Sequence, residues 1–347
     1  MPTPIPSSPE GLLAQLPPPP PGRTGWPWTQ QTPPPAATPG ESAGAWPRIS
    51  IVTPSFRQGR FIEETIRSIL LQNYPNLEYH VIDGGSDDET VEILKKYEPW
   101  LSGWVSEKDR GQTHAINKGM ERVSGAILAY LNSDDYYMPG AFERVARAHL
   151  EHPEADLFHG ICVYVNEAGL RIGQQTANIH AFEDLVDLWG VWWQRRQFVQ
   201  PEVFWTSRVA SKVGPFRESL YFVMDYEYWG RILMTGAKVQ YLDGEVTCFR
   251  KAAYQKSSQA SRAAGELIEV IGPWLWDSST PIPAGRRRAL QARWLYRSKF
   301  MATLDTSRSK GESRLRRWLR AAGCIARHPQ LMRSSDFQAK IRGYLPR

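Results

Sequence analysis

The fold is decided by the stretch AILAYLNSDDYYMPGA, residues 126–141, in which an apolar run leads directly into a polar cluster. The run from Ile127 to Leu131 has the length and composition of a buried strand. Two adjacent carboxylates repel each other and are costly to bury, so such a cluster is either solvated or lies beside a cation. The cluster consists of Asn132, Ser133, Asp134 and Asp135.

Strand and helix patterns alternate on the amino-terminal side of this stretch. Apolar runs typical of strands are separated by segments with helical spacing of apolar residues. In chain order, strand and helix alternate over residues 49–52, 60–73, 77–83, 86–99, 100–109, 111–123 and 125–131. The alternation predicts an α/β sandwich of three layers, with a mixed, mainly parallel sheet covered by helices on both faces.

Three of the predicted strands end in polar residues. Ligands of open α/β sheets bind outside the carboxyl ends of the strands, where these residues would converge. The polar ends are Thr53-Pro54-Ser55, Asp83-Gly84-Gly85 and the cluster after Leu131. We therefore expect one crevice at this edge of the sheet.

The ends of the chain differ in composition from its centre. Residues 1–47 hold 15 of the 27 prolines, which predicts a disordered, flexible arm. Residues 48–255 carry the strand and helix patterns. Residues 256–347 return to helical patterns and contain 19 Lys and Arg against 6 Asp and Glu. This basic helical region would cover the domain or lie on an anionic membrane surface.

Several classes of protein are disfavoured by the composition. The longest apolar runs are far shorter than the roughly 20 residues that cross a bilayer. Near Met1 we find no cationic segment followed by an apolar core, and the three cysteines are far apart. We therefore predict a cytoplasmic protein, with peripheral contact at the inner face of the cell membrane through the basic region.

The motifs, taken in order, resemble glycosyltransferase family 2. They are ISIVTPSFRQGRF, HVIDGGSDDETVEIL, SEKDRGQTHAINKGM and AILAYLNSDDYYMPGA, and the resemblance covers residues 48–250. It implies a Rossmann-like GT-A fold, with a nucleotide-sugar-binding half at 48–140 and an acceptor half at 141–255. A single motif would mean little, whereas several in order are specific.

The resemblance implies a divalent metal, Mg or Mn. A departing nucleoside diphosphate needs positive charge in the transition state, and hard oxygen ligands hold such a cation. In the family a DxD motif does this, and here Asp134 is the expected ligand, assisted by Asp135. Asn132 replaces the first acid and brings no charge. The alternative is an aspartate pair that caps a turn before Pro139.

The resemblance also assigns the donor site. Asp83 corresponds to the residue that binds the base, and Thr53, Pro54 and Ser55 correspond to the loop against base and ribose. The other positions implied to line the donor site are Asp109, Asn117, Asn132 and Asp134. A turn-forming role for Asp83 is the alternative, because aspartate before glycine is typical of turns.

Inversion at a sugar carbon needs a carboxylate that takes the proton of the attacking hydroxyl. In YFVMDYEYWGRIL, residues 221–233, the family motif implies that Asp225 is this base. Glu227 remains a rival, and either acid could cap the helix. Arg250, with Lys256, would meet the diphosphate. An aromatic stretch, which offers either an acceptor platform or core residues, supplies Trp189, Trp192, Trp193 and Trp205.

The sequence thus predicts an inverting, metal-dependent glycosyltransferase that acts on a glycan or lipid-linked saccharide. A sugar-phosphate nucleotidyltransferase is one alternative, but it should carry a glycine-rich stretch soon after the first strand, where only Gly59 is present. A non-catalytic, membrane-associated scaffold protein is the other. No nucleic-acid partner is expected, because the basic region lacks the motifs of such modules.

Overall fold

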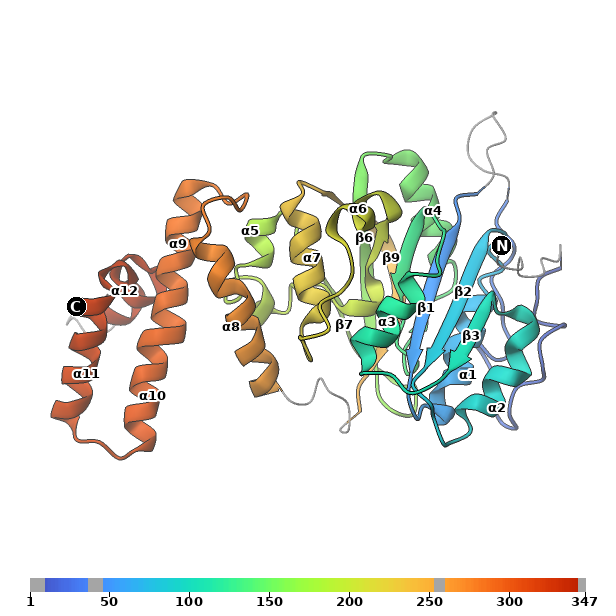
Figure 1. Cartoon of the computed structure of the whole chain (residues 1–347), viewed down its shortest axis with the longest axis horizontal. Coiled ribbons are helices and arrows are strands. Elements are labelled where there is room, and N and C mark those ends of the chain that lie inside the picture. The colour runs from blue at the N-terminus through green and yellow to red at the C-terminus, as the bar shows by residue number, and fades with distance from the viewer. Residues whose placement is uncertain (1–9, 37–45, 253–259, 343–347) are drawn as a thin grey trace.

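The computed structural model describes residues 10–36, 46–252 and 260–342. Its strands are β1 Ile49–Ser55, β2 Leu77–Asp83, β3 Gly103–Ser106, β4 Ile127–Tyr130, β5 Tyr136–Tyr137, β6 Ala155–Val165, β7 Arg171–Thr176, β8 Phe204–Thr206 and β9 Lys238–Arg250. In the described residues they form one sheet in the order β3-β2-β1-β4-β8-β6-β9-β5, with β7 paired to β6 (Figure 1). The predicted α/β fold with a mixed sheet is confirmed.

The helices lie around this sheet and beyond one end of it (Figure 1). They are α1 Gly59–Leu70, α2 Thr90–Tyr97, α3 Gln112–Met120, α4 Ala141–Glu151, α5 Phe182–Leu185, α6 Ser207–Val213, α7 Met224–Met234, α8 Ala260–Trp276, α9 Ala284–Trp294, α10 Ala302–Ser309, α11 Arg314–Arg327 and α12 Ser335–Arg342. A short 3-10 turn, η3 Gln200–Glu202, precedes β8.

The amino-terminal half of the sheet is parallel. β1 pairs with β2 and β4, and β2 pairs with β3, all in parallel. β1, β2 and β4 are buried along their whole length, as strands covered on both faces are. α3 packs so closely that a Cβ atom at Gly119 would lie 2.2 Å from Cγ1 of Val52. Glycine at this position therefore permits the close contact of helix and sheet.

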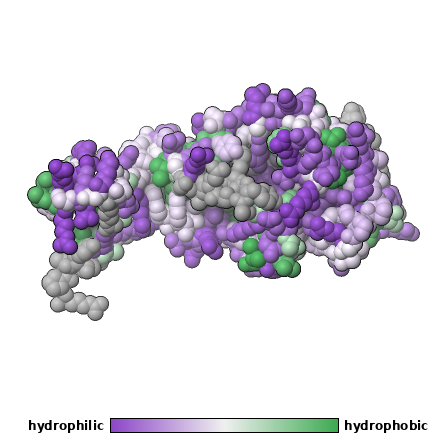
Figure 2. Space-filling model, turned by 90° about the horizontal axis from the view of Figure 1, so that it is seen from below, coloured by the Kyte–Doolittle hydropathy of each residue, from purple (hydrophilic) through white to green (hydrophobic). Residues whose placement is uncertain are grey.

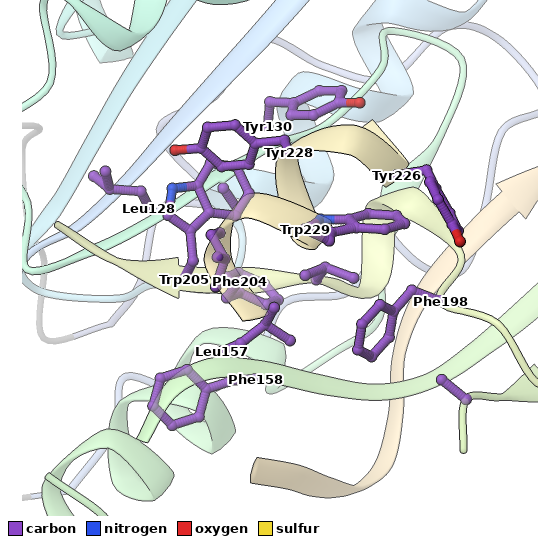
Figure 3. Packing of buried hydrophobic residues seen from close by; sticks show 14 of the residues in the cluster. Leu128, Tyr130, Leu157, Phe158, Phe198, Phe204, Trp205, Tyr226, Tyr228 and Trp229 are labelled. Carbon is purple, nitrogen blue, oxygen red and sulfur yellow. The ribbon is translucent and has the colours of Figure 1, made fainter. Parts of the chain in front are cut away.

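The two halves share the sheet and the core. β8 joins them, because it pairs antiparallel with both β4 and β6. Its Trp205 is 1% exposed and packs against Tyr130 and Tyr228, with ring centroids 6.5 and 5.4 Å away (Figure 3). Of the two roles considered for this tryptophan, the structure gives the core role. The carboxyl half of the sheet continues with β6 and β9, which are parallel.

The proline-rich segment differs from the flexible arm that its composition predicts. Within residues 10–36, Leu12, Leu16 and Trp28 are buried against the domain. Arg67 of α1 is fully buried, and its guanidinium donates to backbone carbonyls of this segment at 2.8 to 3.0 Å. The accepting carbonyls are those of Pro17, Pro27 and Trp28. Prolines lack a donor but keep the carbonyl, so they can satisfy a buried arginine.

The basic carboxyl-terminal region begins as part of the domain and then leaves it. α8 packs on α7, and a Cβ atom at Gly230 would lie 2.3 Å from the Trp274 ring. Asp187, which is 3% exposed, binds Arg286 and Arg293 of α9 at 2.8 Å each. The helices α10 to α12 form the far end of the molecule (Figure 1). Among the described residues, no helix is both long and apolar enough to cross a membrane.

Candidate functional site

The polar strand ends meet at one edge of the sheet, as expected. Ser55 and Asp83 are partners in the β1–β2 register, and the Gly84 N–H donates to the Ser55 carbonyl at 2.8 Å. The Leu131 N–H donates to the Val52 carbonyl at 2.9 Å, which places the cluster after β4 beside the end of β1. The three segments therefore lie next to one another along this edge.

Asp83 is fully buried and organises the turn that follows β2. Its Oδ2 accepts hydrogen bonds from the backbone of Gly85 and Ser86 and from Ser106 Oγ, at 3.1, 2.8 and 2.6 Å. Its Oδ1 accepts a bond from Ser86 Oγ at 2.5 Å. These contacts match the turn-forming alternative, and the contact with a nucleobase stays a prediction.

Phe56 is a residue of this edge that the sequence interpretation missed. It follows β1 directly and is 54% exposed. A Cβ atom at Gly84 would lie 3.3 Å from the Phe56 ring and 2.8 Å from Oδ2 of Asp109. Because glycine has no side chain, the Phe56 ring and the Asp109 carboxylate can both lie close to this turn. The signal in the sequence is a large aromatic residue immediately after a strand that ends in polar residues.

Thr53 and Ser55 are buried at the carboxyl end of β1. The Tyr79 hydroxyl donates to Thr53 Oγ1 at 3.1 Å. Ser55 Oγ is buried and has no hydrogen-bond partner within the described residues. Because buried hydroxyls are normally paired, this oxygen is one that a ligand could satisfy.

Asn132 belongs to a chain of amide groups that crosses the site. Gln112 Nε2 donates to Asn132 Oδ1 at 2.7 Å, and Asn132 Nδ2 donates to Gln200 Oε1 at 3.1 Å. Gln200 Nε2 in turn donates to the Tyr130 carbonyl at 2.7 Å. The asparagine, which stands where the family has an acid, therefore connects α3, the end of β4 and η3.

Asp134 and Asp135 are adjacent but differently placed. Asp134 is half-buried, whereas Asp135 is 1% exposed. Asp135 Oδ1 accepts the backbone N–H of Arg250 at 2.8 Å, and its Oδ2 has no hydrogen-bond partner within the described residues. Burial and then the charge of Asp134 raise the pKa of the Asp135 carboxyl well above its usual range. A cation at this pair would lower that pKa, because it favours the ionised carboxylates.

Arg250 binds this cluster from inside the protein. Its placement corrects its predicted role at the diphosphate. It is 2% exposed, and its Nη2 binds Glu64 Oε2 at 2.8 Å. Its Nε donates to the Asp134 carbonyl at 3.0 Å, and its Nη1 donates to two further carbonyls, of Asn166 and Glu167. The guanidinium is therefore fully engaged inside the protein. Lys256 lies outside the described residues.

Asn117 faces the acceptor half. Its Nδ2 donates to the Phe216 carbonyl and its Oδ1 accepts the Phe216 N–H, each at 2.9 Å. This reciprocal pair ties α3 to the segment that leads into α7. The amide is used for that contact, and its part in lining the donor site stays a prediction.

Asp225 lies in the first turn of α7 and is half-buried. Burial raises the pKa of the Tyr130 phenol well above its usual range, and the Asp225 and Asp135 carboxylates raise it further. Ring contacts also link Tyr130 to α7, because Phe216 packs on Tyr130 and on Tyr228 of this helix, with centroid distances of 5.6 and 3.8 Å. Glu227, the rival base, is 3% exposed and binds Arg231 at 3.0 Å.

The remaining tryptophans lie in one short segment, and one of them contacts α7. Trp192 packs against Tyr226 with ring centroids 5.0 Å apart. Trp189 and Trp193 stack with an interplanar angle of 12°, and Trp193 is 44% exposed. This stacked pair presents an aromatic face in the same short segment as Trp192, which packs on α7.

Comparison with known protein families gives a match at these segments. Residues 50–217 match the model of the family described as glycosyl transferase family 2. The matched region contains the strand ends of the site from Ser50 to the end of β4, and also β8.

Curated relatives are similar over part of the chain. TuaG of Bacillus subtilis strain 168, assigned by its name to teichuronic acid biosynthesis, is 33% identical over 117 residues, 33% of this chain and 46% of the relative. An uncharacterized glycosyltransferase of Mycobacterium tuberculosis is 38% identical over 92 residues, 26% of this chain and 35% of the relative. The chain thus matches less than half of these two relatives. An uncharacterized glycosyltransferase of Rickettsia typhi is 25% identical, over 66% of this chain and 70% of the relative.

Solved structures share the fold at low identity. Staphylococcus aureus TarS 1-349 in complex with UDP-GlcNAc has a TM-score of 0.56 and 16% identity, over 80% of this chain and 79% of that one. The mannosyltransferase PcManGT of Pyrobaculum calidifontis, in complex with GDP-Man and Mn2+, has a TM-score of 0.55 and 18% identity, over 84% and 82% of the chains. The GT-A type of α/β fold is thereby confirmed.

Proposed function

From the match of residues 50–217 to glycosyl transferase family 2, we propose that the protein transfers a sugar from a nucleotide-diphosphate sugar to an acceptor hydroxyl. The transfer inverts the configuration at the sugar carbon and uses a divalent metal. The observation that carries the proposal is the meeting of the polar ends of β1, β2 and β4 at one edge of the sheet, within the segment that matches the family. Reaction by inversion needs a base and a charged leaving-group site on opposite sides of one sugar carbon. The acceptor is a glycan or a lipid-linked saccharide.

The donor nucleotide would bind across the ends of β1 and β2. The exposed Phe56 ring offers a flat apolar face for the base. Ser55 Oγ, buried and unpaired in the described structure, would gain a partner from the ligand. The turn organised by Asp83, together with Asp109, closes the other side.

A divalent cation would be held by Asp134, with Asp135 Oδ2 as the second oxygen. Within the described residues no three His, Cys, Asp or Glu side chains are grouped to hold a metal. A carboxylate pair nevertheless fits Mg²⁺ or Mn²⁺, which take their remaining ligands from substrate phosphates and water. Bound there, the cation supplies positive charge to the departing diphosphate.

Asp225 would take the proton of the acceptor hydroxyl. Its position in the first turn of α7 stabilises the ionised carboxylate, because the helix amino terminus carries partial positive charge. An ionised carboxylate is the form that a general base requires. The partly exposed Trp189–Trp193 pair would pack on the C–H face of an acceptor sugar.

The test is transfer from a panel of UDP-, GDP- and dTDP-sugars in the presence of Mn²⁺ or Mg²⁺, measured as released nucleoside diphosphate. Asp134→Ala should lower the apparent metal affinity and the rate, and Asp225→Asn should lower kcat by about 100-fold or more with donor affinity nearly unchanged. Asp243→Asn, at an exposed site on β9, is the matched control. If neither Asp134→Ala nor Asp225→Asn has its expected effect, the assigned roles of both residues are wrong. Formation of pyrophosphate from a nucleoside triphosphate would support a nucleotidyltransferase instead.

Helix α11 supports a second proposal, contact with an anionic membrane surface. Leu315, Trp318 and Leu319 are 68, 66 and 54% exposed and lie at i, i+3 and i+4, so they share one face. Exposed arginines at positions 314, 316, 320 and 327 lie on the same helix. Figure 2 shows apolar side chains bordered by hydrophilic ones at the end of the molecule that these helices form. An apolar face with arginines beside it is the pattern of helices that lie in a bilayer interface.

A further inference from the structure

Glu266 of α8 binds the backbone that leads into α7. Its Oε1 accepts the N–H of Tyr221 at 2.8 Å. Its Oε2 accepts the N–H groups of Phe222 and Val223 at 2.7 and 2.9 Å. One carboxylate thus satisfies three consecutive backbone donors, and hydrogen bonds to a charged acceptor are among the stronger ones in proteins.

These donors belong to the residues that set the start of α7. Val223 is the N-cap residue, and its apolar side chain cannot accept a hydrogen bond from the helix. Glu266 therefore fixes the entry to the helix from outside. Asp225 follows Val223 by two residues, so any movement of this entry moves its carboxylate.

The same segment is held from its other side by α3. The reciprocal pair of Asn117 and Phe216 anchors its beginning, at 2.9 Å in both directions. On the α8 side, Leu267 and Ile271 are buried in the core and Trp274 packs on Gly230 of α7. Glu266 is therefore presented by a helix that is itself fixed, which a positioning contact requires.

We infer that Glu266 is a positioning residue for transfer, which sets the place of the Asp225 carboxylate relative to the acceptor hydroxyl. The inference rests on the proposed role of Asp225 as base. It also assigns a catalytic purpose to a residue of the basic carboxyl-terminal region, outside the segment that matches the family. General base catalysis is sensitive to geometry at the level of 1 Å, so a loosened helix entry should affect the rate rather than donor binding.

The test compares Glu266→Ala and Glu266→Gln with Glu269→Gln, an exposed glutamate on the same helix. Glu266→Ala should lower kcat by roughly 10- to 100-fold, with the KM for the donor changed less than about twofold. Glu266→Gln keeps one accepting oxygen, so its kcat should lie between those of the wild type and Glu266→Ala. Glu269→Gln should leave kcat unchanged. If Glu266→Ala fails to fold, a lowered kcat of Glu266→Gln supports the inference and an unchanged kcat contradicts it.

A double variant separates this inference from the proposed function. If Glu266 acts through Asp225, then adding Glu266→Ala to Asp225→Asn should change the residual rate by less than about twofold, because the two effects are not additive. If the double variant instead loses rate by the product of the two single-variant factors, the positioning role is overturned while Asp225 remains the base. Full activity of Asp225→Asn alone would overturn the base assignment and the inference with it. Equal kcat for all Glu266 variants would overturn the inference alone.

Discussion

Asp83 and Asp225 are both acids at the end of an element, and their surroundings give them different chemistry. Asp83 follows a strand and is enclosed by the turn that it organises, with bonds from Gly85, Ser86 and Ser106. Asp225 begins a helix and stays half-buried. The sequence predicted the positions of both residues correctly at element ends. The direction of each side chain depends on contacts with distant segments, which local patterns do not contain.

Glu202 provides a pH-dependent prediction at the residue scale. It is fully buried, and burial raises the pKa of its carboxyl well above its usual range. The folded protein therefore favours the neutral form, and stability should fall as the pH rises above about 4.3, the usual pKa of glutamate in an unfolded chain. Glu202→Gln removes this dependence. We expect it to raise Tm by a few degrees at pH 8 and to have little effect near pH 4.

Thermal unfolding of Glu202→Gln and wild type from pH 4 to pH 8 measures this. Glu92→Gln, which changes an exposed glutamate on α2, should give nearly the same Tm difference from wild type at every pH. A Glu202→Gln curve parallel to that of the wild type would show that the carboxyl is not neutral in the folded state.

At the element scale, the proline-rich segment shows how composition can mislead. Prolines at this density are typical of disordered chains, because they remove backbone donors. Residues 10–36 instead pack on α1, which is buried on every side from Phe61 to Leu70, including at Arg67. An arginine in that position has to find acceptors. The arginine is therefore the signal in the sequence for this packing. It can be recognised only once it is known that this part of the helix is covered.

Arg67→Met should therefore loosen the segment. The substitution keeps an apolar stem but leaves the carbonyls of Pro17, Pro27 and Trp28 without their donor. Unpaired buried carbonyls cost about 1–3 kcal/mol each, so we expect a loss of about 3 kcal/mol in the free energy of unfolding. Urea unfolding gives the energy, and limited proteolysis within residues 10–36 reports release of the segment.

Arg60→Met is the matched control, because Arg60 lies on the same helix with an exposed side chain paired to Glu167. Surface ion pairs contribute little, so its effect should stay below about 1 kcal/mol. Equal stability of the Arg67 and Arg60 variants, with no new cleavage in the segment, would contradict the proposed clamp.

At the scale of the whole molecule, the basic region has two parts with different roles. The sequence left open whether these helices cover the domain or lie on a membrane. α8 and α9 cover it, through Trp274 and the Asp187 ion pairs. α11 lies at the far end and keeps an apolar face exposed. Net charge alone could not divide the region, because both parts are rich in arginine.

Substitution on α11 tests the membrane proposal without removing buried helices. Trp318→Ser with Leu319→Ser should weaken binding to phosphatidylglycerol-containing vesicles by about 10-fold or more, because two apolar anchors are lost. Binding of the wild type should also weaken in 0.5 M salt, because the Debye length of about 4 Å shortens the range over which the arginines attract anionic lipid. Cosedimentation measures both.

Leu170→Ser is the control, because Leu170 is 65% exposed on the turn between β6 and β7, away from α11. It should bind vesicles like the wild type. Equal binding of the α11 variant, or equal binding to neutral phosphatidylcholine vesicles, would remove the proposal.

The shared sheet also constrains how the proposed acceptor specificity can change. β8 and β9 of the carboxyl half pair directly with β4 and β5 of the amino half, as in Leu128 with Trp205 and Tyr136 with Cys248. A chimera cut near residue 140 would have to preserve both registers. The two halves are therefore poor modules for recombination. New specificity has to arise by substitution in side chains and loops above a framework that stays in place.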